Sequence, residues 1–334
     1  MDTAARETSS SLSLPAACLH GHDTATLSQA MGLLAIVGDL SMGQPIDGSE
    51  RAARLAARVA AAAGANAAAC GHARMVALLR WSGCTANAAG FATMLGDDVG
   101  ARHALVSRTL NAQQSARLRD TTELAEIHCE VAGDIAAMMG LPAAVESGLR
   151  HVWEHYDGSG LPLHLRGDEV PSVVYHAVLG GDLEILARVH GVDRALEMIA
   201  QLGDIKYPAR LVALVAPHAR AWLDELEAEE ARSSQPDFLP VSVPLTLVAD
   251  MIELKLPWLA GYSRRVALLA QEAAQLAGLP EAQQRCLARA ALLHGIGRAA
   301  VTNTVWERSG KLGAADWEAV RLVPYWTARA GSRI

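Results

Sequence analysis

Aromatic residues are scarce in this chain. Phe, Trp and Tyr make up only 4% of the 334 residues, although hydrophobic residues make up 51%. The apolar content is therefore largely alanine, leucine and valine, which favour closely packed helices over a β-sandwich or barrel. We predict an all-α chain that is long enough for two domains.

Other absences exclude whole classes of protein. Basic residues are not in excess, since 29 Lys and Arg face 36 Asp and Glu, so we expect no direct DNA binding. No run of about 18 residues is free of charge, so no membrane span is expected. The N-terminus shows no basic start followed by an apolar core, as a signal peptide would. The five cysteines show no CxxC spacing and fit a reducing cytoplasm.

The composition changes along the chain predict four segments. Residues 1–26 are rich in Ser, Thr and Ala without periodicity and are interpreted as a flexible tail. Helical periodicity marks residues 27–224 as the first domain. Residues 225–243 run from acidic to Ser, Gln and Pro and are predicted to be a linker. Residues 244–334 are helical again and form a shorter second unit.

The second unit repeats part of the first at a constant offset, because Leu33 matches Leu247 (247 − 33 = 214). The same offset joins the pairs Ser49/Ser263, Arg51/Arg265, Gly64/Gly278 and Gly83/Gly297. Alanine-rich helices can match by chance, but paired glycines and a repeated Ser-x-Arg do so less readily. We interpret the pattern as a duplicated helical unit, with the second copy truncated.

Three stretches carry a resemblance to a known family. They are AGYSRRVALLAQEAAQLAGLP from residue 260, AALLHGIGR from residue 290 and EHYDGSGLPLHLRGDEVP from residue 154. The first two, from the second unit, and the third, from the first unit, together resemble the HD-GYP family of HD-domain phosphohydrolases. The doubled arrangement also resembles bacterial HD-domain regulators that carry a LuxR-type DNA-binding part. The resemblance implies tandem helical HD bundles, with iron or manganese ions that hydrolyse a cyclic dinucleotide such as cyclic di-GMP.

The metal ligands that the resemblance implies are mostly absent. The adjacent His-Asp pair corresponds to Arg80 and Trp81 in the first unit, and to His294 and Gly295 in the second. His128 and Asp182 stand near further ligand positions, so His128, Asp182 and His294 are the remaining metal candidates. Neither unit keeps a complete set, so no cofactor is expected, and iron or manganese is the candidate if a site survives.

Other candidate residues have structural alternatives. Arg298, Glu154 and Asp157 are candidate catalytic groups. Arg298 takes the place of a lysine in the resembling family and could hold a phosphate, although a surface arginine is the simpler interpretation. Glu154 and Asp157 are expected to fix a turn by accepting backbone hydrogen bonds. The sequence HVWEH from His151 also fits an inverted zinc-protease signature, if it is helical.

Four arginines allow two interpretations. Arg51, Arg54, Arg58 and Arg80 could line a pocket for a nucleotide phosphate, but a solvated helix face is the favoured interpretation.

Three hypotheses for function follow. The leading one is a regulatory or interaction module of HD-GYP descent without phosphodiesterase activity, which could self-associate or bind a protein partner and could still bind a nucleotide. The second is a metal-dependent phosphohydrolase acting on a cyclic dinucleotide. The third is a truncated remnant of a longer transcriptional regulator.

Overall fold

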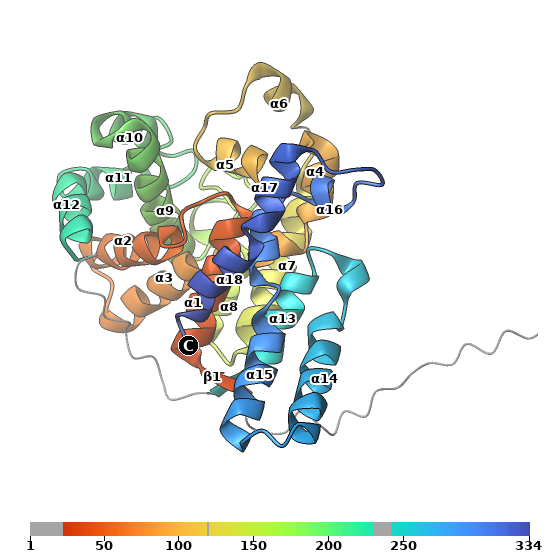
Figure 1. Cartoon of the computed structure of the whole chain (residues 1–334). Coiled ribbons are helices and arrows are strands. Elements are labelled where there is room, and N and C mark those ends of the chain that lie inside the picture. Colours follow the sequence, from red (N-terminus) through yellow and green to blue (C-terminus); the bar gives the residue numbers. More distant parts are fainter. Residues whose placement is uncertain (1–22, 119, 230–241) are drawn as a thin grey trace, which may run out of the picture.

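The computed structural model describes residues 23–118, 120–229 and 242–334 and is built almost entirely from helices (Figure 1). The all-α prediction is confirmed. The elements of the first part are β1 (Thr24–Thr26), α1 (Leu27–Ser41), α2 (Gly48–Ala62), α3 (Ala67–Leu79), α4 (Ala88–Leu95), α5 (Gly100–Val106), α6 (Ala112–Arg117), α7 (Thr122–Met138), α8 (Ala143–Arg150), α9 (Ser172–His190), α10 (Val192–Ala200), α11 (Ala209–Val215) and α12 (Ala219–Glu229). Those of the second are β2 (Ser242–Pro244), α13 (Leu245–Glu253), α14 (Tyr262–Leu276), α15 (Glu281–Leu293), α16 (Asn303–Trp306), α17 (Ala314–Arg321) and α18 (Val323–Gly331).

The predicted tail and linker need correction at their inner ends. Residues 1–22 and 230–241 lie outside the described residues. Thr24–Thr26 form β1, which pairs antiparallel with β2 at Ser242–Pro244. Residues 225–229 continue α12 instead of belonging to the linker. Strands of three residues carry no alternating pattern that sequence reasoning could detect.

The repeat in the sequence is matched by the helix bounds. Helices α2 and α14 start and end 214 residues apart (262 − 48 and 276 − 62), and so do α3 and α15 (281 − 67 and 293 − 79). The glycines Gly64 and Gly278, which follow α2 and α14, both have positive φ, at 82° and 66°. These bounds support the interpretation of a duplicated unit.

A second pair of glycines sits at equivalent close contacts. A Cβ on Gly83 would lie 2.2 Å from the carbonyl oxygen of His128, and one on Gly297 would lie 2.0 Å from that of Val323. The backbone of α7 therefore contacts the turn after α3 in the same way as that of α18 contacts the turn after α15. Val323 takes the position that His128 has in the first part.

The two parts share one hydrophobic core. Buried side chains of α1, α3 and α7 form a single cluster with those of α13, α15 and α18. A second cluster joins α2 and α9 to α10, α11 and α12. The units predicted at 27–224 and 244–334 are thus packed against each other and not separate. Among the described helices, none has the length and apolar content that crossing a membrane requires.

A buried polar network also links the two parts. The Asp98 carboxylate, before α5, pairs with the Lys255 ammonium group, and both side chains are fully buried. Asp98 also accepts hydrogen bonds from the Thr302 hydroxyl at 2.8 Å and the Asn303 backbone N–H at 2.7 Å.

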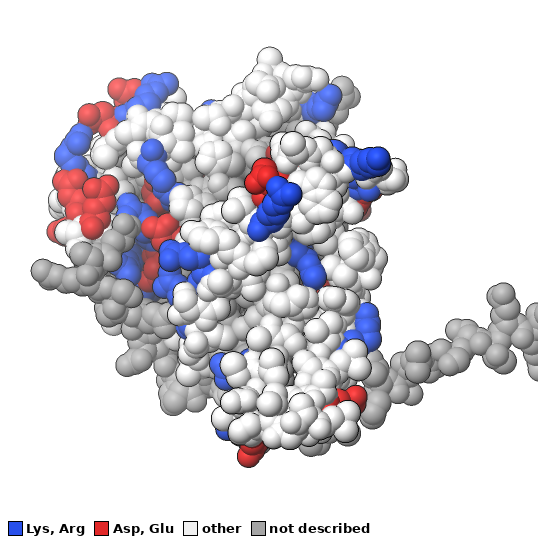
Figure 2. All heavy atoms as spheres, in the orientation of Figure 1, with Lys and Arg blue, Asp and Glu red and all other residues white. Residues whose placement is uncertain are grey.

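The equivalent helices α2 and α14 differ in how far neighbouring helices bury them. Leu55 on α2 is fully buried under α9, where Gly180 lies against the α2 backbone. Its counterpart Leu269 on α14 is 64% exposed, and Leu276 on the same helix is 91% exposed. On the visible face, charges are mixed around α10–α12 and sparse around α14 and α15 (Figure 2).

Candidate ligand-binding cavity

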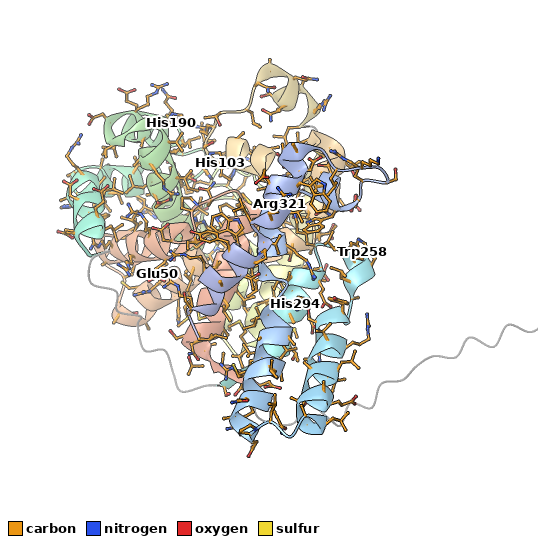
Figure 3. All side chains as sticks on the ribbon, viewed as in Figure 1. Glu50, His103, His190, Trp258, His294 and Arg321 are labelled. Carbon is orange, nitrogen blue, oxygen red and sulfur yellow. The ribbon has the colours of Figure 1, made fainter. Side chains whose placement is uncertain are left out.

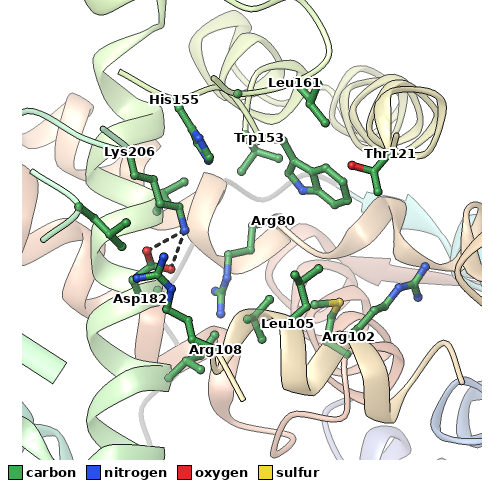
Figure 4. A pocket seen from close by; sticks show the side chains of 18 of the residues that line it. Arg80, Arg102, Leu105, Arg108, Thr121, Trp153, His155, Leu161, Asp182 and Lys206 are labelled. Atoms are coloured by element: carbon green, nitrogen blue, oxygen red, sulfur yellow. Dashed lines mark hydrogen bonds and ion pairs between the residues drawn. The ribbon is translucent and has the colours of Figure 1, made fainter. Parts of the chain in front are cut away.

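A cavity of about 450 Å³ opens beside the end of α3 in the first part (Figure 4). Small-molecule sites typically enclose about 300–1,000 Å³. Its walls come from the end of α3, from α4 and α5, from the segment after α8, from α9 and from the loop after α10. The lining residues with polar or aromatic side chains are Arg80, Trp81, Phe91, Arg102, Arg108, Thr121, Trp153, His155, Ser159, Asp182 and Lys206.

Arg80 lies at the centre of this cavity (Figure 4). It follows the buried pair Leu78 and Leu79 and is itself only 3% exposed. Its Nη1 donates to the Ala77 carbonyl at 2.7 Å, while Nε and Nη2 are buried without a hydrogen-bond partner among the described residues. Burial lowers the pKa of Arg80 from its ordinary value, with the charges of Asp39, Glu184 and Asp182 acting in the opposite direction. The prediction that Arg80 belongs to a solvated face is wrong, because the turn after α3 directs this residue inward.

The other three arginines of that set lie elsewhere. Arg51 pairs with the buried Glu184 at 3.1 Å, Arg54 pairs with Glu50, and Arg58 donates to the Trp222 carbonyl. None of these three lines the cavity.

One end of the cavity is charged. Both carboxylate oxygens of Asp182, on α9, accept from the Lys206 ammonium group at 3.0 and 2.7 Å. Arg108 lies nearby with a φ of 58°, and His155 completes this end (Figure 4). Burial, followed by the charge of Lys206, lowers the pKa of His155 to about 4, so its imidazole is neutral near pH 7. Lys206 neutralises Asp182, which leaves a surplus of positive charge at this end.

The other end is apolar and aromatic. One face of the Trp153 ring stacks on His128, with 4.9 Å between the ring centroids, and Phe91 meets Trp153 edge-on at 6.4 Å. Arg102 lies over the Phe91 ring, 4.4 Å from its centroid, and donates to the Cys84 carbonyl at 2.9 Å. The cavity therefore joins an aromatic wall to a cationic one.

The residues present do not fit the metal centre that the resemblance implies. His128 is fully buried, with Nε2 2.9 Å from the Arg80 carbonyl and Nδ1 3.6 Å from the Cys84 sulfur. Both oxygens of Asp182 are engaged by Lys206. Within the described ranges no three His, Cys, Asp or Glu side chains are grouped as a metal ion would need. A cationic side chain, Arg80, stands instead where the resemblance places a ligand.

The equivalent place in the second part is filled by its own side chains. His294 follows α15 (Figure 3) and its Nδ1 lies 2.6 Å from the Ala291 carbonyl oxygen. The Arg298 guanidinium lies 3.3 Å from His294 Nε2 and 5.4 Å from the centroid of the Tyr262 ring. A Cβ on Gly295 would meet Arg298 Nη1 at 2.9 Å, so Arg298 occupies the direction an aspartate side chain would take.

Glu154 and Asp157 hold the turn-rich segment between α8 and α9. The buried Glu154 carboxylate accepts from the backbone N–H groups of Leu163 and Leu165, at 2.7 and 3.0 Å. Asp157 accepts from the Ser159 N–H at 2.8 Å. Both contacts are those expected of turn residues.

The zinc-protease interpretation of residues 151–155 is wrong, because it requires a helix there. Helix α8 ends at Arg150. His151 instead contacts the Ser147 carbonyl, and His155 contacts the Ser159 hydroxyl.

Sequence reasoning missed several residues of the cavity. Arg102 and Arg108 lie in and just after α5, but Trp153 and Lys206 come from two other segments far along the chain, and no local motif links the three segments. The available signal was Arg80, which stands in the sequence where the resemblance places the first residue of a metal-binding pair.

Comparison with known proteins agrees with this architecture. Residues 246–332 match the family described as HD domain. A curated relative, the 3′3′-cGAMP-specific phosphodiesterase 3 of Vibrio cholerae serotype O1, is 27% identical over 212 residues, which cover 60% of this chain and 46% of the relative. These two matches support the resemblance to HD-domain phosphohydrolases. The chain spans about half the length of this curated relative.

A solved structure shows the same fold as this chain. The crystal structure of the cyclic GMP-AMP-specific phosphodiesterase V-cGAP3 of Vibrio cholerae superposes with a TM-score of 0.71 at 22% sequence identity, covering 93% of this chain and 80% of that one. This likeness shows the fold of the chain.

Proposed function

We propose that the chain binds a nucleotide phosphodiester of the cyclic dinucleotide class in this cavity and acts as a regulatory binding module. The supporting observation is the composition of the cavity, whose lining includes Arg80, Arg108 and the Lys206–Asp182 pair together with Trp153 and Phe91. A nucleotide matches both groups of residues, because its anionic phosphate pairs with cationic side chains and its flat aromatic base stacks on aromatic ones.

The curated relative supports the same class of ligand. Its name specifies 3′3′-cGAMP as substrate, so the ligand proposed for this chain is a 3′,3′-linked cyclic dinucleotide. Hydrolysis is not part of the proposal, since His128 and Asp182 have other partners and Arg80 and Trp81 replace a metal-binding pair.

Calorimetric titration of the full chain with 3′,3′-cGAMP tests this proposal. We expect saturable binding with one site per chain and no conversion of the ligand when the same mixture is analysed by ion-pair chromatography. The proposal would be refuted if millimolar ligand produced neither heat of binding nor a shift in the thermal unfolding midpoint.

Metal-dependent hydrolysis is the second candidate, and the similarity to a curated phosphodiesterase favours it. It requires ligands that the cavity does not assemble. Elemental analysis of the purified chain separates the candidates: iron or manganese at one or more equivalents, together with linear dinucleotide or mononucleotide products, would replace the binding-module proposal.

A further inference from the structure

The N–H groups of Arg80 are incompletely satisfied. Its guanidinium is almost fully buried, yet Nε and Nη2 have no hydrogen-bond partner among the described residues. Buried charged donors without partners are rare in folded proteins, because their lost hydration is not replaced. Arginine remains protonated in proteins. The Arg80 guanidinium lies over the Trp81 ring, 4.7 Å from its centroid, and an anionic acceptor would satisfy its two remaining donors.

The surroundings leave the position of that acceptor open. Gly181 on α9 lies beside Arg80, and a Cβ there would be 3.2 Å from Nε. The next residue, Asp182, brings a carboxylate to the cavity lining, but Lys206 donates to both of its oxygens. The unsatisfied donors of Arg80 therefore adjoin a cavity that already contains a second, ion-paired cation (Figure 4).

We propose that Arg80 binds a phosphate group of the ligand directly, at the place where the HD-domain family holds a metal ion, so that ligand binding is independent of metal. The inference rests on the proposed function for the class of ligand. The planar guanidinium offers two parallel N–H groups that match two phosphate oxygens. A fixed positive charge at this point also repels a divalent cation.

The position of Arg80 sets the orientation of the ligand. Its phosphate lies between Arg80 and Lys206, and a base lies toward Trp153, which carries the aromatic wall. A nucleoside without phosphate keeps the stacking contact but loses the charged one.

Calorimetric titrations of the EDTA-treated full chain test this with 3′,3′-cGAMP, GMP and guanosine as probes. We expect the same Kd for the dinucleotide with EDTA as with added Mn²⁺, and no measurable binding of guanosine. Arg80→Met weakens binding about 100-fold, the effect of losing a desolvated bidentate ion pair. Arg80→Lys weakens it about 10-fold, because lysine keeps the charge but not the fork.

A matched control separates binding from folding. Arg194→Met makes the same change in an exposed pair with Glu197 on α10 and should leave every Kd unchanged. The thermal unfolding midpoint of ligand-free Arg80→Met should equal or exceed that of the wild type, because the substitution removes buried unsatisfied donors. A purely structural arginine would give the reverse, a lower midpoint with unchanged binding.

The outcomes distinguish this inference from the proposed function. Binding that requires Mn²⁺, or that Arg80→Met leaves intact, overturns the role of Arg80 alone. Binding of GMP through Arg80 without binding of the dinucleotide overturns the proposed function alone. Binding of neither overturns both.

Discussion

The buried pair of Lys255 and Asp98 gives the sharpest prediction about stability. Both side chains are inaccessible to solvent. In Lys255→Met the Asp98 carboxylate keeps two neutral donors from the described part of the chain, the Thr302 hydroxyl and the Asn303 N–H. Breaking a buried ion pair by removing one partner costs about 3–5 kcal/mol, since the remaining charge is uncompensated. Methionine fills a similar volume, so the cavity left by the substitution should add little.

An exposed pair in the same part of the chain provides the control. Arg264 pairs with Asp250, and both side chains are 41% exposed. Arg264→Met should therefore cost only about 0–1 kcal/mol.

Urea unfolding followed by circular dichroism measures both variants. The double variant Asp98→Asn with Lys255→Met removes both charges and should recover most of the lost stability. The reasoning fails if Lys255→Met costs no more than Arg264→Met, or if the double variant is as unstable as the two single variants combined.

Three further predictions use other features. Burial raises the pKa of Asp39 from 3.8 to about 7, against the hydrogen bonds from Ser49, so the folded state holds this proton where the unfolded state has lost it. The stabilisation by this proton is complete below pH 3.8 and is lost as the pH rises through about 7, by up to ~4 kcal/mol. In Asp39→Asn this part of the pH dependence of the free energy of unfolding, measured with urea, should disappear. An unchanged dependence on pH would contradict the assignment. Leu55→Ala should lower the free energy of unfolding by about 2–5 kcal/mol, whereas Leu269→Ala at the repeated position should change it by less than about 0.5 kcal/mol; equal effects would mean that Leu269 is covered in solution. Self-association also remains a prediction, motivated by the exposed leucines of α14, and light scattering after size exclusion that reports only a monomer would remove it.

The cavity illustrates why the site was harder to predict than the fold. The departures from the His-Asp pair of the resembling family could be recognised at Arg80 and Gly295, because that pair belongs to a short motif at a helix end. The sequence could not show that Arg80 is buried, that Asp182 is neutralised by Lys206, or that Trp153 stacks on His128. Each of these depends on helices that are distant in the chain and meet only in the packed structure.

By itself, the sequence determined the helical class and the 214-residue repeat, because alanine-rich periodicity and paired glycines act locally on helix formation and helix ends. Tertiary structure alone decided that the two parts share one core and that Leu55 is buried while Leu269 is exposed. It also placed the guanidinium of Arg80 in the cavity. Burial and charge pairing depend on what packs against a residue, and identical local patterns can receive different neighbours.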